Sequence, residues 1–222
     1  SSSYRVNGEI PVIPLESFSD EVASAMEDVS QKMEEQDLYL NSSPGYWLRT
    51  FDRWADCEEF IGFPLNNPLE KSSLLETANY FAIAQDAETL NEESQRHCAV
   101  ALQGNIKGEL QHVTIDTGYL MGPIRIQMTV SLYPEGSGME PGTGGSWNGE
   151  AEFEITSGVT GEGIPYTLVV SETPESDYYN DFSSADAYFV LKNGLYTLDA
   201  VSPGRDSGAD AKAALEELLA LF

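Results

Sequence analysis

The sequence predicts an α+β fold, a mostly antiparallel sheet with an N-terminal amphipathic helix and a C-terminal helix packed on it. Apolar residues alternate with polar ones through the second half, as in half-buried strands. Apolar stripes at helical spacing lie near both ends of the chain. We expect residues 1–45 to form an N-terminal arm and helix, and residues 46–222 to form the α+β domain. A single domain overall also fits the 222 residues.

The N-terminal segment begins extended and then becomes helical. Its prolines disfavour helix in "EIPVIPLESF". A helix is predicted from about residue 19 to residue 36, because apolar residues recur on one side of it. The apolar residues are Phe18, Val22, Met26, Val29 and Met33. We expect this stripe to pack on the core rather than to bind a partner.

The segment "TFDRWADCEEFIGFPL", residues 50–65, has the pattern of a short capped helix. Asp52 is the predicted N-cap. Gly62 suits the left-handed position just past the helix end, and Pro64 prevents the helix from resuming. The side chains on its apolar side are Trp54, Cys57, Phe60 and Ile61. These features predict a structural fastener rather than a catalytic segment.

Strands dominate from His97 onward, whereas residues 66–96 show no clear pattern. The segments "HCAVALQG", "ELQHVTIDTGY", "PIRIQMTVSLY" and "IPYTLVVSE" are predicted strands, as is the alternating run 151–156. In the third of these, Ile124, Ile126, Met128, Val130 and Leu132 share one face. The glycine-rich segment "PEGSGMEPGTGGSWNGE" is predicted to be a flexible loop.

A hairpin and a helix close the chain. Asn193-Gly194 favours a two-residue type I′ turn, which would place Leu191 opposite Tyr196 and Phe189 opposite Leu198. The segment "GADAKAALEELLALF" is a predicted helix with Asp210 as its cap. Its apolar stripe consists of Ala211, Leu215, Leu218 and Phe222. We expect this helix to lie across the sheet.

The charge excludes some classes of partner. The formal net charge is −26, and the eleven Lys and Arg residues are dispersed. Nucleic acids and anionic membranes would be repelled, so we expect no nucleic-acid partner. No stretch reaches the ~18 apolar residues of a membrane span, so we expect membrane contact only through a tether upstream of Ser1. The initial serines suit the linker of such a tether, and an expression remnant would equally explain them.

No catalytic residue, metal ligand set or cofactor motif is evident. His97 and His112 are the only histidines, and nucleophile, zinc and phosphate-binding motifs are missing. We therefore expect no cofactor and no metal. Cys57 and Cys98 are expected to be reduced and buried, and a single disulfide between them, outside the cytosol, is the alternative. The segment "ETPESDYYNDFSSAD" is predicted to be a solvated acidic loop without calcium-hand spacing. Its acidic residues are Glu175, Asp177, Asp181 and Asp186.

Three aromatic residues are the candidate ligand-binding residues. Trp147 lies in the glycine-rich segment, and Tyr178 and Tyr179 lie in the acidic segment. Aromatic side chains on loops can close over a ligand, although more often such residues fold back on the domain.

Two segments resemble a bacterial family. Residues 50–65 resemble the F-x-(S/D)-x-x-E/A-x-x-x-x-G-F-x-L motif of extracytoplasmic domains of unknown function in Gram-positive bacteria. "NGLYTLDA", followed by "ALEELLALF", resembles the closing strand and helix of that family. Such domains occur on anti-sigma-factor-like membrane proteins and lipoproteins. The family supplies no catalytic residues.

The resemblance implies an extracytoplasmic location, at the cell surface or anchored to the membrane. We expect a non-catalytic sensing or binding module that binds a protein or a small ligand at the cell surface. The charge and the missing catalytic motifs agree with this interpretation. A carboxylate-dependent hydrolase and a structural surface domain are the alternatives.

Overall fold

The structure is a computed structural model of the chain. It describes residues 2–5, 24–25, 27–29, 31–32, 46–51, 53–77, 100–105, 113–132, 144–147, 152–172, 181–191 and 194–222.

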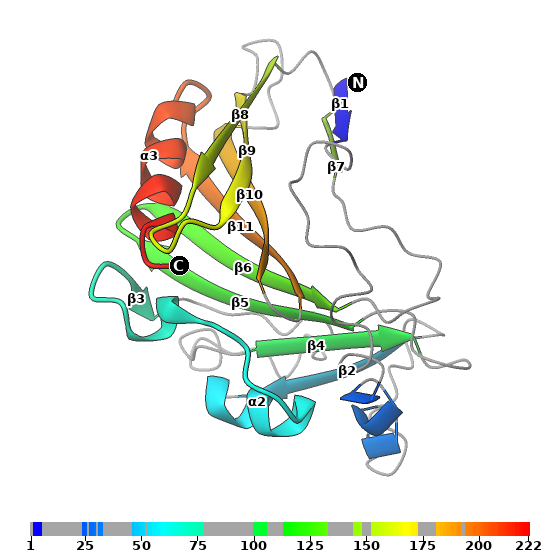
Figure 1. The fold of residues 1–222 in the computed structure, drawn as a ribbon. Helices are drawn as coiled ribbons and strands as arrows, with labels where there is room; N and C mark the ends of the chain where they lie inside the picture. Colours follow the sequence, from blue (N-terminus) through cyan, green and yellow to red (C-terminus); the bar gives the residue numbers. More distant parts are fainter. Residues whose placement is uncertain are drawn as a thin grey trace, which may run out of the picture.

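A nine-stranded antiparallel sheet forms the centre of the fold (Figure 1). Its strands lie in the order β2-β4-β5-β6-β11-β10-β9-β8, with the short β3 also paired to β5. The bounds of these strands are β2 Tyr46–Phe51, β3 Glu76–Thr77, β4 Val100–Asn105, β5 Val113–Met121, β6 Ile124–Leu132, β8 Glu152–Val159, β9 Pro165–Glu172, β10 Phe182–Leu191 and β11 Gly194–Pro203. The prediction of a mostly antiparallel sheet is therefore confirmed.

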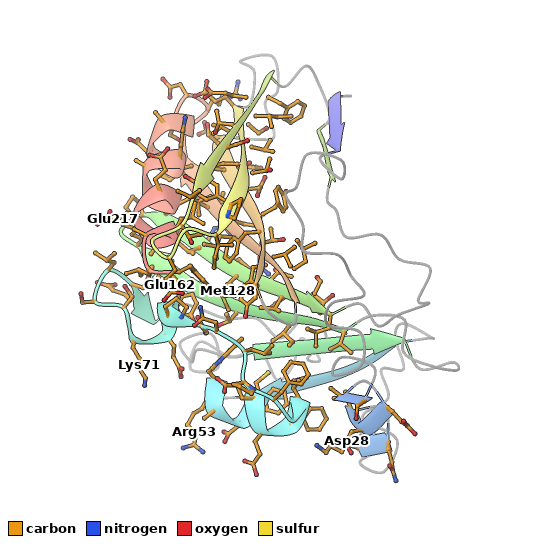
Figure 2. The ribbon with its side chains drawn as sticks, in the orientation of Figure 1. Asp28, Arg53, Lys71, Met128, Glu162 and Glu217 are labelled. Atoms are coloured by element: carbon orange, nitrogen blue, oxygen red, sulfur yellow. The ribbon has the colours of Figure 1, made fainter. Side chains whose placement is uncertain are left out.

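One face of the sheet, here called the apolar face, is covered by the C-terminal helix α3, Gly208–Leu219. Helix α3 packs on β9, β10 and β11, and it lies along them in Figure 1. Met128 lies within the layers in Figure 2, whereas Glu217 projects outward from α3. The predicted stripe is confirmed, because all four of its residues are fully buried: Ala211, Leu215, Leu218 and Phe222.

Aromatic packing fixes the end of the chain against the sheet. The Phe222 ring meets the Phe189 and Tyr196 rings edge-on, with centroids 5.0 and 6.0 Å away. Phe189 and Tyr196 stack on each other at 5.3 Å. The backbone N–H groups of Gly161 and Glu162, in the β8–β9 connection, donate to the carbonyls of Leu219 and Phe222. The last turn is thus held by ring packing and by hydrogen bonds to groups that a helix end leaves unpaired.

Residues 53–71 contribute buried apolar side chains to the hydrophobic core, as the fastener prediction required. Helix α2, Trp54–Ile61, ends at Gly62, whose φ of 92° is the predicted left-handed conformation. The four apolar residues predicted for this helix are all buried. Trp54 Nε1 donates to the Leu65 carbonyl at 3.1 Å, which ties the helix to the segment that leads into the 3₁₀ turn η3, Pro68–Lys71.

Part of the N-terminal segment packs beside α2. Residues 24–25, 27–29 and 31–32 are helical. Ala25 and Val29 are buried. The Lys32 ammonium donates to the Phe60 carbonyl at 3.0 Å and pairs with Asp28 at 2.9 Å. This segment is therefore held in place by the buried Ala25 and Val29 and by the Lys32 ammonium.

The predicted register of the final hairpin is wrong by two residues. Leu191 lies opposite Gly194, and Phe189 lies opposite Tyr196 rather than Leu198. Gly194 therefore belongs to β11 and is not a turn residue. A Cβ added to Gly194 would lie 2.6 Å from Val130 Cγ1 on β6. The glycine is needed there for close strand packing, whereas the sequence pattern suggested backbone freedom.

Three further local predictions are corrected. Both helix caps lie elsewhere, because Arg53 and not Asp52 precedes α2, and Ser207 and not Asp210 precedes α3. The Ser207 hydroxyl instead donates to the Gly204 carbonyl at 2.9 Å. The predicted glycine-rich loop contains a strand, β7 Gly144–Trp147, which pairs with β1 Ser2–Arg5.

Truncating the Trp54 side chain tests the fastener role of residues 53–71. Trp54→Ala should lower the free energy of unfolding by about 3–5 kcal/mol, as for other large buried aromatics. Arg53→Ala is the matched control, because Arg53 is exposed and its pair with Asp56 is a surface contact of little worth. Urea unfolding measures both. Equal midpoints for Trp54→Ala and the wild type would contradict the packing described.

Adding a methyl group at position 194 tests the hairpin register. Gly194→Ala should cost about 1–3 kcal/mol by overpacking against Val130. Val130→Ala removes the atom in the way, so the double variant should be more stable than the sum of the two single changes predicts. Additive effects in this double-mutant cycle would argue against the contact.

Candidate binding face

The second face of the sheet, here called the polar face, carries side chains that hydrogen-bond. Side chains alternate along strands, so the pairing registers identify which residues share a face. One row across five strands, from β5 to β9, reads Asp116, Thr129, Thr197, Tyr188 and Thr167. The next row reads Gly118, Gln127, Asp199, Asp186 and Val169. The residues opposite the sealed core are therefore mostly hydroxyl, amide and carboxyl groups.

A pair of carboxyl groups lies at the centre of this face. Asp186 on β10 is directly opposite Asp199 on β11. Burial raises the pKa of Asp199 well above its usual range, and the hydrogen bond to Asp186 together with the charges of Asp186 and Asp116 raises this pKa further. The protonated Asp199 carboxyl can therefore donate a hydrogen bond to Asp186, which accepts it.

A third carboxyl group lies two strands away from β11. Asp116 on β5 is 8% exposed and accepts a hydrogen bond from the Thr129 hydroxyl at 2.7 Å. Burial raises the pKa of Asp116, and the Thr129 hydrogen bond lowers it in part. Thr129 thus stabilises the charged form of Asp116, which burial disfavours.

The middle of the polar face is partly exposed to solvent, whereas Asp116, Tyr188 and Thr167 in the same rows are buried. The side chains of this middle part can donate through amide, hydroxyl and protonated carboxyl groups and can accept through all of them. The partly exposed residues, here called the polar strip, are Gln127, Thr129, Asp186, Thr197 and Asp199.

Apolar surface lies at the edge of the same face. Ile155 pairs with Val169, and Val159 lies four residues further along β8, so both side chains point to the polar face. They are 42% and 65% exposed. These exposed apolar side chains therefore lie on the same face as the polar strip and are separated from it by β9.

Two shallow hollows lie elsewhere, beside α2. One, of about 690 Å³, is bordered by Trp54, Glu58 and Glu70 among others. The other, of about 440 Å³, lies between α2 and the N-terminal helical residues, against Ala25 and Asp28. Burial raises the pKa of Glu58, the Trp54 hydrogen bond lowers it, and the Glu70 charge raises it again. Neither hollow contains the carboxyl pair of the polar face.

The predicted ligand residues are placed only in part. Trp147 lies at the end of β7, opposite Ser2, and not in a loop. In the view of Figure 1, the β1–β7 ribbon stands on the opposite side of β8–β11 from α3. Tyr178 and Tyr179 lie outside the described residues. These three residues are therefore not brought together by the part of the chain that is described.

The central residues of the polar face were not identified from the sequence. Asp186 was predicted to lie in an acidic loop, but it lies within β10 and faces another aspartate. The sequence predicts no role for Asp116 or Asp199. The available signal was alternation, because hydrogen-bonding and apolar residues alternate from Ser184 to Phe189. Alternation indicates a face, but only strand pairing brings Asp186 to Asp199.

The described residues contain neither a metal-binding cluster nor a membrane-spanning helix. Within these ranges no group of three or more His, Cys, Asp or Glu side chains is arranged to hold a metal ion. None of the helices described has the length and apolar character needed to cross a membrane.

Cys57 is buried and free, as predicted, and burial raises the pKa of its thiol to about 12. Cys98 lies outside the described residues.

Comparison with known proteins gives no match: no protein-family model, no curated protein and no solved structure matches this chain. Function is therefore inferred from the residues of the polar face.

The Thr129–Asp116 hydrogen bond can be tested through its pH dependence. Thr129→Val keeps the strand shape but removes the donor, so the pKa of Asp116 should rise further. A raised folded-state pKa lowers stability as pH rises above the ordinary value of about 3.9. We expect a loss of about 1–3 kcal/mol at pH 7 and a smaller loss at pH 3.

Thr156→Val is the matched control, because Thr156 is a partly exposed strand threonine on the opposite face. Urea unfolding at the two pH values measures both variants. A loss in Thr129→Val that is equal at pH 3 and pH 7 would contradict the role given to this hydroxyl.

Proposed function

We propose that this chain is a non-catalytic binding module and that its ligand lies on the polar strip. The observation that carries the proposal is the division of the sheet into two faces. One face is sealed by α3 and by aromatic packing. The other leaves amide, hydroxyl and carboxyl groups partly exposed at its centre. Burying polar groups between strands is costly unless they are paired, so their presence favours a binding role over a purely structural one.

The ligand we propose is neutral or cationic and rich in hydroxyl or amine groups. The net charge of −26 and the three aspartates of the polar face disfavour an anionic ligand. The threonine hydroxyls and the Gln127 amide both donate and accept, as recognition of hydroxyl groups requires. Ile155 and Val159 offer apolar contact farther along the same face, on β8. An oligosaccharide with amino sugars, of the kind found in bacterial cell walls, fits this chemistry.

The location belongs to the same proposal. We propose that the chain works outside the cytoplasm, at the cell surface, on a membrane-tethered bacterial protein. The resemblance of residues 50–65 and 188–222 to extracytoplasmic domains supports this location. We also propose that residues 19–36 form one amphipathic helix. The buried Ala25 and Val29, set against the exposed Glu27 and Asp28, support this helix.

A carboxylate-dependent hydrolase is the second candidate, and one observation favours it. Asp199, with its raised pKa, lies beside Asp186, and such a pair can supply an acid and a base. Neither of the two hollows beside α2 encloses this pair. Hydrolysis of a soluble cell-wall glycan by the wild type, lost in Asp199→Asn, would favour this candidate over the binding module.

Thermal melting with soluble ligands tests the binding proposal. Cell-wall oligosaccharides should raise the melting temperature, and unrelated peptides should not, because a ligand that binds only the folded state stabilises it. Thr197→Val and Gln127→Met remove hydrogen-bonding groups from the polar strip and should abolish the shift. Thr156→Val, on the other face, should keep it.

Variants of Trp147 separate two positions for the ligand. A shift that survives Trp147→Ala but not Thr197→Val would place the ligand on the polar strip alone. Loss of the melting-temperature shift in both variants would place the end of β7 in the binding site. A shift unaffected by Thr197→Val and Gln127→Met would contradict the proposal.

A further inference from the structure

Asp186 and Asp199 are directly opposed on neighbouring strands. Directly opposite residues in an antiparallel pair have Cβ atoms about 4.5–5.5 Å apart, and like charges placed so are destabilising. The lateral neighbours of the pair are Gln127 on β6 and Val169 on β9. Neither neighbour carries a charge that could compensate a second carboxylate.

The described strands around the pair offer little cationic compensation. On β5 the charged group that faces the same side is Asp116, which adds a negative charge. On β6 it is Arg125, which is exposed and pairs with Val201 in the next row. Along the paired parts of β8 and β9 the same face receives only uncharged residues. These are Phe153, Ile155, Ser157, Val159, Pro165, Thr167, Val169 and Ser171.

We propose that Asp186 and Asp199 share one proton and that this proton is a pH-responsive latch on the β10–β11 hairpin. With the proton present, the two carboxyl groups are joined by a hydrogen bond across the strands. When the proton leaves, to water, two carboxylates remain opposed in a partly buried site. The β10–β11 pairing is then weakened from the polar face.

The latch acts on the same hairpin that holds α3. Phe189 and Tyr196, which pack against Phe222, lie on β10 and β11 three residues from Asp186 and Asp199. Because this offset of three positions is odd, the rings and the carboxyl groups point to opposite faces of the sheet. Loss of the proton therefore strains the hairpin on which the C-terminal helix docks.

The direction of the pH effect is set by proton binding. The folded chain holds the shared proton more tightly than the unfolded chain, where an aspartate has a pKa of about 3.9. Stability from the latch is fully present below that value, and it falls as pH rises through the higher folded-state pKa of Asp199. The latch needs no ligand, so its failure is distinguishable from failure of the proposed function.

Urea unfolding of the full chain between pH 4 and pH 9 tests the latch. The variants are Asp199→Asn, Asp186→Asn and the control Asp181→Asn, which alters an exposed aspartate outside the polar face. The folded-to-unfolded ratio of the wild type, divided by that of Asp199→Asn, should fall about tenfold or more from pH 4 to pH 8. Each unit by which the folded-state pKa is raised contributes a factor of about ten. Parallel curves for the wild type and Asp199→Asn would overturn the proposal.

If Asp199→Asn does not fold, the number of protons released on unfolding still tests the proposal. Unfolding at pH 5.5 should release about one proton from the pair, because the aspartates of the unfolded chain are ionised at that pH. Asp186→Asn, which removes the neighbouring charge and the carboxylate acceptor, should release fewer protons than the wild type, whereas Asp181→Asn should release the same number. Equal release by the wild type and Asp186→Asn would contradict a proton shared by the pair.

Discussion

The pairing of β10 with β11 is the interaction on which both faces of the molecule depend. In this register Phe189 lies opposite Tyr196, so that the two rings stack and receive the Phe222 ring at the end of the chain. The same register places Asp186 opposite Asp199 on the other face. A shift of one residue would exchange the faces, and a shift of two would separate both pairs. The core and the carboxyl pair are therefore consequences of a single alignment.

The alignment is enforced mostly from the apolar face. Phe189, Leu198 and Phe222 are fully buried, and Gly194 permits β6 to approach where a methyl group would meet Val130. Burying large aromatic and aliphatic side chains stabilises a fold by several kcal/mol, more than an isolated surface contact provides. The apolar packing can therefore hold two carboxyl groups together on the opposite face, at a cost that a shared proton reduces. Strain of this kind is typical of sites that serve a function.

The sequence predicted the elements that local physics decides. Alternation identified β5, β6 and β9, and the stripe from Ala211 to Phe222 identified α3 and its buried side. Gly62 was recognised because a left-handed residue past a helix end has few alternatives to glycine. The hairpin register was predicted wrongly, because Asn-Gly is a strong local turn signal and the contact of Gly194 with β6 is not local. The carboxyl pair could not be predicted, since it depends on that register and on which strands are neighbours.

Backbone NMR of the β10–β11 hairpin tests this account most directly. Cross-strand nuclear Overhauser effects should connect Phe189 with Tyr196 and Asp186 with Asp199, as the register described here requires. Contacts of Phe189 with Leu198 and of Asp186 with Val201 would instead show the register of an Asn193-Gly194 turn. That result would separate the two aspartates and contradict the account of both faces.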